Sequence, residues 1–182
     1  PMTRPDALAA HTAHRLGIAS MGLETGADVT LKKINKGATA AQMIDMGRKA
    51  RTAGLKISIT VLLGIAGRER SAIHARETGR VLTAIDPEYV GALSLMLIPG
   101  TPLCHDFEAG RFEILEPVEM LQELRTMIDH THLSRGLFHA NHASIYLPIW
   151  ARLPRDREAT LNLIDDALAG RIRLKPEYLR AL

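Results

Sequence analysis

The sequence has a single cysteine, Cys104, among its 182 residues. One thiol cannot form a disulfide framework within the chain, which is typical of a protein from a reducing compartment. No apolar run approaches the roughly 18 residues that a membrane-spanning helix needs. The first residues also show no charged segment followed by an apolar one, the pattern of a secretory leader. We therefore expect a cytoplasmic protein without a membrane partner.

Aromatic residues are also scarce, at 4% of the sequence, and charge of one sign is not in large excess. The 23 basic and 20 acidic residues give a net charge of +3, and the basic residues are scattered. A nucleic-acid surface usually needs clustered Lys and Arg with stacking rings, so we do not expect a nucleic-acid partner. The 46% hydrophobic content predicts one globular domain with a sizeable core.

Three alternations of strand and helix account for the first part of the chain. Strands are predicted over 18–23, 56–64 and 89–97. One intervening helix begins with a capping box, Thr39 and Gln42, and ends at Gly54. Another ends before the Asp86-Pro87 pair, because the residue before proline disfavours helix. Strands separated by helices in this way pair in parallel with right-handed crossovers.

The two faces of the second strand differ in polarity. Ile57, Ile59, Val61 and Leu63 share one face, whereas Ser58, Thr60 and Leu62 share the other. A fully covered parallel sheet would have two apolar faces. One apolar and one partly polar face indicates instead a barrel whose interior holds a ligand.

The alternation stops after the third strand. Helices are predicted from Pro117 and over 156–168, the segment 136–150 is left without a strand, and 176–182 adds one more turn. We therefore divide the chain into a barrel part, 1–103, and an α-rich extension, 104–182. Because a helix-like segment over 5–16 leads directly into the first strand, we expect the chain to be the later part of a longer protein.

The most informative segment is 21–28, which reads as a strand that ends on Glu24 and is followed by a glycine-bearing turn. A short helix and an Asn-Lys-Gly stop at 35–37 come next. A second glycine turn follows the next strand, and a Pro-Gly-Thr-Pro turn follows the third. Turns at the carboxyl ends of strands are where α/β folds place their chemistry.

These segments resemble the radical S-adenosylmethionine (SAM) enzymes, and most closely the subgroup related to oxygen-independent coproporphyrinogen oxidase. The matching segments are 22–28 (GLETGAD), 35–37 (NKG), 63–69 (LGIAGRE), 95–103 (LMLIPGTPL), 141–144 (NHAS), 146–148 (YLP) and 153–154 (LP). The resemblance implies a partial (β/α)6 TIM-like barrel, of which this chain holds the last three βα units and an α-rich C-terminal extension.

The family also holds a 4Fe–4S cluster on three cysteines spaced Cys-x3-Cys-x2-Cys, and the reduced cluster cleaves SAM to a 5′-deoxyadenosyl radical. Cys104 alone cannot hold that cluster, and it lies in a different place. Either the cysteine-bearing half of the barrel lies upstream, which we favour, or the chain is a degenerate copy. In the first case the upstream half is a partner and the chain alone is inactive. Its small-molecule substrate is not indicated by these residues.

The resemblance implies roles for three polar side chains in SAM binding. Glu24 would accept hydrogen bonds from ribose hydroxyls, since a carboxylate offers acceptors only. Thr60 lies at another ribose-side position, where related enzymes often have a carboxylate. Lys36 would face the carboxylate of SAM. Without the resemblance, Glu24 would be read as a strand-end ion-pair partner and Lys36 as a cation favoured at a helix C-terminus.

Four further residues are implied near the adenine. Gly64 and Gly67 would let the backbone approach the ring, whereas Leu97 and Ile98 would cover it. The same glycines also fit a plain strand-to-helix turn. Two other functions stay open: a cluster-less barrel remnant that binds a nucleotide or a partner protein, and a barrel enzyme that binds phosphate on the backbone amides of the 64–67 turn.

Four histidines, His105, His132, His139 and His142, could suggest a metal site, but they lack a recognised ligand spacing. We therefore predict no metal ligands and favour structural or substrate-side hydrogen bonding for them. The segment 141–144 resembles the family's tail motif, in which asparagine usually follows, whereas here Ile145 does.

Overall fold

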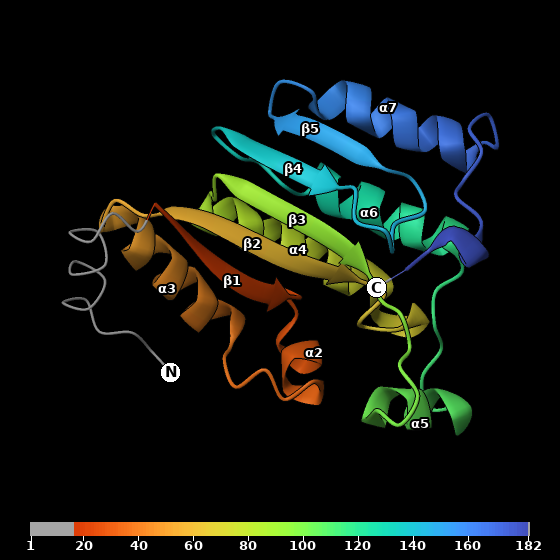
Figure 1. Ribbon diagram of the computed structural model, residues 1–182. Coiled ribbons are helices and arrows are strands. Elements are labelled where there is room, and N and C mark those ends of the chain that lie inside the picture. The colour runs from red at the N-terminus through yellow and green to blue at the C-terminus, as the bar shows by residue number, and fades with distance from the viewer. Residues whose placement is uncertain (1–16, 182) are drawn as a thin grey trace.

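The computed structural model describes residues 17–181, so the helix predicted over 5–16 lies outside the described residues. Its centre is a sheet of five strands in the order β1-β2-β3-β4-β5 (Figure 1). The first four strands are parallel and the last is antiparallel to its neighbour. The strands are β1 (Ile18–Glu24), β2 (Lys56–Leu63), β3 (Tyr89–Ser94), β4 (Gly136–Ala140) and β5 (Ile149–Leu153).

A layer of four helices covers one face of this sheet, while α2 and α5 lie beyond the carboxyl ends of the parallel strands (Figure 1). No helix in the described part of the chain covers the other face, which we call the open face. The covering helices are α3 (Ala40–Thr52), α4 (Ser71–Ile85), α6 (Pro117–Asp129) and α7 (Arg157–Leu168); the others are α2 (Asp28–Lys33) and α5 (Pro102–Glu108). Short 3-10 turns occupy Arg68–Arg70 and Glu177–Leu179.

The polarity of β2 sets its orientation in the sheet, as the sequence predicts. Its four aliphatic residues at odd-numbered positions are almost wholly buried beneath the helices, and Ser58, Thr60 and Leu62 lie on the open face. Complete burial of an aliphatic side chain of this size contributes about 1.5–3 kcal/mol. A register shift of one residue would forfeit that contribution along the whole strand.

The helix ends also follow the sequence. Thr39 and Gln42 form the predicted capping box of α3. The α4 helix ends where Asp86 adopts a left-handed conformation (φ 55°) just before Pro87. The α6 helix begins with Pro117 at its first turn, where a missing N–H costs no hydrogen bond.

The C-terminal extension differs from the expectation in one respect, because it contains two strands: β4 lies within the segment left without a strand, and β5 begins at the end of that segment and continues to Leu153. The strand β4 pairs in parallel with β3, and β5 pairs with β4. Both strands alternate between buried and more exposed residues, with Phe138 fully buried beneath the sheet. The extension therefore widens the sheet and adds α6 and α7 to the helix layer.

The strand β1 lies at one edge of the sheet and pairs only with β2 among the described residues. Together with the uncovered face, this gives the architecture of a partial barrel, as predicted. Across residues 17–181, no helix has both the length and the apolar character needed to cross a membrane.

Candidate functional site

The open face is organised in rows of residues that are register partners across the strands. One row contains two glycines and three residues with side chains: Gly22, Thr60, Gly91, His139 and Trp150. Leu62 and Leu93 pair in the next row toward the carboxyl ends. The space above Gly91 is free, since a Cβ there would have no neighbour within 4 Å. A hollow of about 790 Å³ lies over this face, and Ser58, His139 and Asn141 are among the residues that line it.

Glu24, the last residue of β1, is held in an unusual backbone conformation. Its φ of 60° lies in the left-handed region, which costs a non-glycine residue of order 1–3 kcal/mol and often marks a ligand site. The β1–β2 register shifts between Gly22 and Glu24. The side chain turns back over Gly22, where a Cβ would lie only 2.5 Å from Oε1. Because Gly22 is the register partner of Thr60, the carboxylate and Thr60 share the open face.

Lys36 contacts the same carboxylate. After α2 the chain turns through Asn35, which is also left-handed (φ 53°), and Lys36 Nζ donates a hydrogen bond to Glu24 Oε1 at 3.1 Å. Both side chains are 26% exposed. The sequence predicts a separate ligand contact for each residue, whereas the structure joins the two. Among the described residues Glu24 Oε2 has no hydrogen-bond partner. The Lys36 ammonium has two more N–H groups that can donate to a ligand.

The turn after β2 contains Gly64 and Gly67, which have φ values of 82° and 72°. Its amides are largely satisfied within the protein. Gly64 N–H donates to Glu123 Oε1 at 2.6 Å, and Gly67 N–H donates to the Gly64 carbonyl at 3.0 Å. With both amides already hydrogen-bonded, neither is available to bind a phosphate. The geometry therefore disfavours the phosphate-binding alternative.

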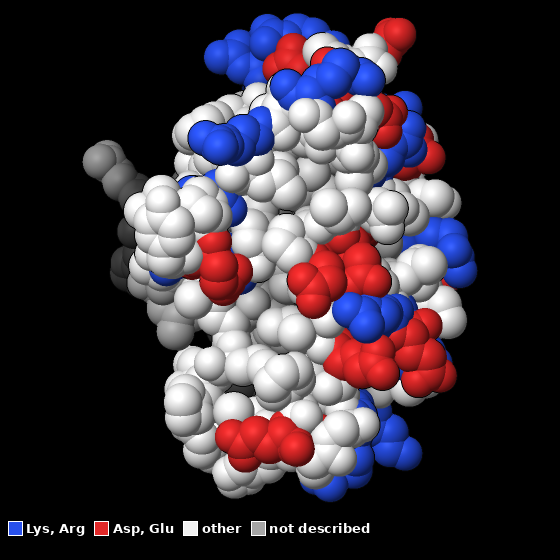
Figure 2. All heavy atoms as spheres, turned by 90° about the vertical axis from the view of Figure 1, so that its right-hand side faces the viewer, with Lys and Arg blue, Asp and Glu red and all other residues white. Residues whose placement is uncertain are grey.

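An apolar cluster lies at the carboxyl ends of the strands. Ile65, Leu95 and Phe112 form its buried part, and Leu62 and Leu97 pack against it. Since Leu62 follows Thr60 on the open face, the cluster begins where the polar row ends. Figure 2 views the molecule from this end, and uncharged atoms dominate the middle of the surface. Ile98, just beyond Leu97, is 48% exposed.

A buried polar network that the sequence analysis did not predict connects α6, α4 and the two turns. Glu123 and His74 are 2% and 0% exposed, and His74 Nε2 lies 3.4 Å from Glu123 Oε1. His74 Nδ1 is 2.7 Å from Thr25 Oγ1. Burial raises the pKa of Glu123 to about 7 and lowers the pKa of His74 to about 4. One signal was available in the sequence: Glu123 lies on the apolar stripe of α6, between Met120 and Met127.

The C-terminal segment ties together the loops that follow β3 and β4. Arg180 Nε donates to the Ser144 carbonyl at 2.6 Å, and Nη2 donates to the Leu95 carbonyl at 3.2 Å. Nη1 contacts the Tyr146 hydroxyl at 2.5 Å. Ser144 Oγ in turn accepts the Ser94 N–H at 3.0 Å. Arg180 therefore fixes the start of the loop that carries Leu97.

The residues present do not fit an iron–sulfur cluster. Cys104 is the only cysteine of the sequence, and it is buried in α5, with Glu108 Oε1 3.5 Å from its Sγ. Over residues 17–181 no group of three or more His, Cys, Asp or Glu side chains is arranged to hold a metal ion. His142 Nδ1 instead lies 3.0 Å from Ser144 Oγ.

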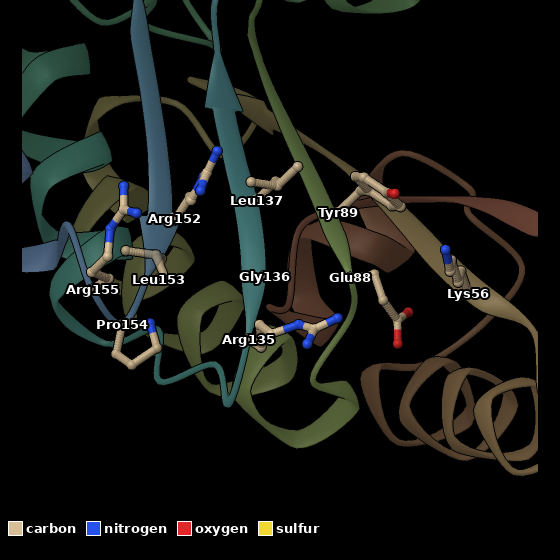
Figure 3. Close-up of a pocket in the computed structure, with 10 residues that line it drawn as sticks. All are labelled: Lys56, Glu88, Tyr89, Arg135, Gly136, Leu137, Arg152, Leu153, Pro154 and Arg155. Carbon is tan, nitrogen blue, oxygen red and sulfur yellow. The ribbon is translucent and has the colours of Figure 1, made fainter.

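A second cleft, of about 390 Å³, lies at the other end of the parallel strands, where their amino ends meet (Figure 3). Lys56, Glu88, Arg135 and Arg152 are among the residues that line it. Glu88 accepts the Ile57 N–H at 2.7 Å, so its carboxylate fixes the start of β2. Active sites of α/β folds rarely lie at the amino ends of the parallel strands. We therefore assign the candidate site to the carboxyl-end edge, where Glu24, Lys36 and Thr60 lie.

Comparison with known proteins finds a structure with a similar fold but no match to a protein family or a curated protein. No protein-family model matches the sequence, and no curated protein matches it. Among solved structures, the archaeal Methanocaldococcus infernus Elp3 with an N-terminal deletion (1–46) is similar, with a TM-score of 0.60 and 16% sequence identity. The match covers 93% of this chain and 41% of that chain, so this chain spans about two fifths of its length. At this identity the likeness shows a shared fold alone, and it does not extend to the coproporphyrinogen oxidase subgroup.

Proposed function

We propose that this chain is the SAM-binding part of a radical SAM enzyme, with the ligand at the carboxyl-end edge of the open face. The observation that carries the proposal is the placement of Glu24. Its carboxylate is held by a left-handed residue over Gly22, on the same face as Thr60, with one oxygen paired to Lys36. A strained residue that holds a half-buried carboxylate on the open face is typical of a ligand site.

The chemistry of SAM matches this set of groups. The two ribose hydroxyls are donors, and the Glu24 oxygen that Lys36 does not contact offers acceptors for them together with the Thr60 hydroxyl. Lys36 keeps N–H donors for the amino-acid carboxylate of the ligand. The adenine would lie against the apolar surface that Leu62 and Leu97 provide next to this row. Ile98, being exposed, would contact the ring only from the outside.

The cluster must come from elsewhere if this function is correct. Its three thiolates are not available in a chain with one cysteine, so we propose that another part of the barrel carries them. The chain alone is then expected to bind SAM without cleaving it. The assignment to the coproporphyrinogen oxidase-related subgroup stays a proposal that rests on the sequence motifs, and so does the cytoplasmic location.

Calorimetric titration of the 182-residue chain with SAM and with S-adenosylhomocysteine tests this function. Both ligands should bind, because they share the ribose, the adenine and the amino-acid carboxylate. Loss of a charge-assisted hydrogen bond costs about 1.5–3 kcal/mol, so Glu24→Ala should weaken binding about tenfold or more. Asp45→Ala is the matched control, since Asp45 is an exposed acid that pairs with Lys49 on α3. Its affinity should equal that of the wild type.

The same titration separates the proposal from its alternative, a cluster-less barrel remnant that binds a nucleotide. The single cysteine is the observation that favours this alternative. ATP and AMP share the adenosine moiety but lack the methionine part. Equal or tighter binding of ATP, or no SAM binding by a folded chain, would contradict the SAM-binding function.

A further inference from the structure

The buried network of His74 and Glu123 connects the two turns at which the proposed site is built. Glu123 accepts the Gly64 N–H from the turn after β2 through Oε1. Its other oxygen, Oε2, accepts the Ser71 hydroxyl at 2.5 Å. Glu123 thus joins the start of α4 to this turn.

The turn after β1 is tied to the same helix by two hydroxyls. Thr25, the residue next to Glu24, is completely buried and contacts His74 Nδ1 at 2.7 Å. Thr78 Oγ1 accepts the Gly26 N–H at 2.8 Å. Gly26 is pressed against α4, because a Cβ there would lie 2.3 Å from the Glu77 carbonyl oxygen. The backbone on the carboxyl side of Glu24 is therefore fixed by α4.

The contact between His74 and Glu123 completes the path but is not a well-formed hydrogen bond. Nε2 lies 3.4 Å from Glu123 Oε1, yet it is one of the few buried polar side-chain atoms without a hydrogen bond in the described part of the chain. An unpaired buried polar atom is costly to keep. Two apolar side chains at these positions would avoid this cost. Stabilisation of the core therefore does not account for His74 and Glu123.

We propose that His74 and Glu123 are positioning residues for the SAM site, which hold the Glu24–Gly26 turn and the Gly64–Gly67 turn in one fixed arrangement. The proposal rests on the proposed function for the identity of the ligand. Its geometric part, the coupling of the two turns through α4 and α6, follows from the contacts above. Removal of either residue should loosen both turns, including the turn that it does not touch.

Amide hydrogen exchange, resolved by residue, tests the coupling without any ligand. His74→Phe removes the contact to Thr25 with a ring of similar size, and we expect faster exchange at the Gly64 amide, which His74 does not bind. Glu123→Leu should in turn accelerate exchange at the Gly26 and Ala27 amides. Glu123→Gln, which can still accept the Gly64 N–H, should restore slow exchange at both turns.

Met127→Ala is the control, because Met127 is fully buried on the same helix but outside the network. It should destabilise the fold without selective changes at the two turns. Exchange changes in His74→Phe and Glu123→Leu that stay within each residue's own turn, or that match the uniform pattern of Met127→Ala, would overturn the proposal.

A double-mutant cycle on SAM affinity then tests whether the pair acts through Glu24. His74→Phe should weaken SAM binding about tenfold in the wild-type background and have almost no effect in Glu24→Ala. Equal losses in both backgrounds would contradict positioning through Glu24. If the wild-type chain binds no SAM, the proposed function fails, and the exchange experiment still decides whether the pair couples the turns.

Discussion

The carboxylate of Glu24 occupies the space that a side chain at Gly22 would need. A Cβ built on Gly22 would lie 2.5 Å from Glu24 Oε1 and 3.2 Å from Lys36 Nζ. Glycine at this position therefore allows the last side chain of β1 to fold back over its own strand. This places an acidic group in the same row as Thr60, at the carboxyl-end edge of the sheet.

Gly22→Ala should therefore displace the carboxylate while leaving the fold nearly intact. The clash involves the far end of a flexible side chain, so the expected loss of stability is small, whereas SAM affinity should fall about tenfold. Gly17→Ala is the control, because Gly17 lies at the amino end of β1 and a Cβ there would have no neighbour within 4 Å among the described residues. Calorimetry with SAM and thermal melting of both variants check this. Unchanged affinity in Gly22→Ala would show that Glu24 does not hold the ligand.

The buried pair of His74 and Glu123 predicts that stability depends on pH in opposite directions in two variants, each of which lacks one member of the pair. The pKa of Glu123 rises from 4.5 to about 7 on folding, so its contribution is full below pH 4.5 and is lost as the pH rises to 7. The pKa of His74 falls from 6.5 to about 4, so its contribution is full above pH 6.5 and is lost as the pH falls to 4. In the wild type the two effects oppose each other, so this pair should add little net pH dependence to the free energy of unfolding.

In each variant, the pH dependence of the free energy of unfolding should reflect the residue of the pair that remains. Glu123→Gln should lose stability as the pH falls from 6.5 to 4, and His74→Phe should lose stability as the pH rises from 4.5 to 7. The slope should approach about 1.4 kcal/mol per pH unit at most. Urea unfolding across this range measures both slopes. Parallel slopes in the two variants would contradict the burial of this pair.

The alternation within β2 and the capping box of α3 made the central part of the fold predictable from sequence. Both signals are local, since each depends on residues that are neighbours along one element. The strands β4 and β5 were not predicted. They are five residues long, too short for a clear periodicity, and their strand character depends on the pairing of β4 with β3 and of β5 with β4.

The candidate site was predictable only in part for the same reason. The position of Glu24 at a strand end follows from the pattern of β1, but its contact with Lys36 depends on how α2 and the left-handed Asn35 turn the chain. The network of His74 and Glu123 arises where α4 packs on α6, a contact between residues 49 positions apart. No pattern within either helix specifies that pairing.

The C-terminal clamp predicts a large loss of stability in Arg180→Met. The change would leave the buried carbonyls of Leu95 and Ser144 without their donor, which should cost about 3 kcal/mol in total. Arg173→Met is the control, because Arg173 is exposed, and it should change stability by about 0.5 kcal/mol or less. Urea unfolding distinguishes the two. Similar values for both variants would show that the clamp contributes nothing.

Among the described residues β1 pairs only with β2, and we expect this edge to cause self-association of the 182-residue chain. An edge strand presents unpaired amides and carbonyls to other molecules, and Ile18 at its start is 47% exposed. Size-exclusion chromatography with light scattering should show concentration-dependent oligomers. Ile18→Lys, which adds a charge to the edge, should shift the chain toward monomer. A wild-type chain that stays monomeric at every concentration would contradict this prediction.

A crystal structure of the chain with SAM would show directly whether Glu24 and Thr60 hold the ribose. We expect the ribose hydroxyls to lie within hydrogen-bond distance of the Glu24 carboxylate and the Thr60 hydroxyl, with the adenine against Leu62 and Leu97. Ligand bound in the amino-end cleft between Arg135 and Arg152, or ribose hydroxyls bonded elsewhere on the open face, would contradict it.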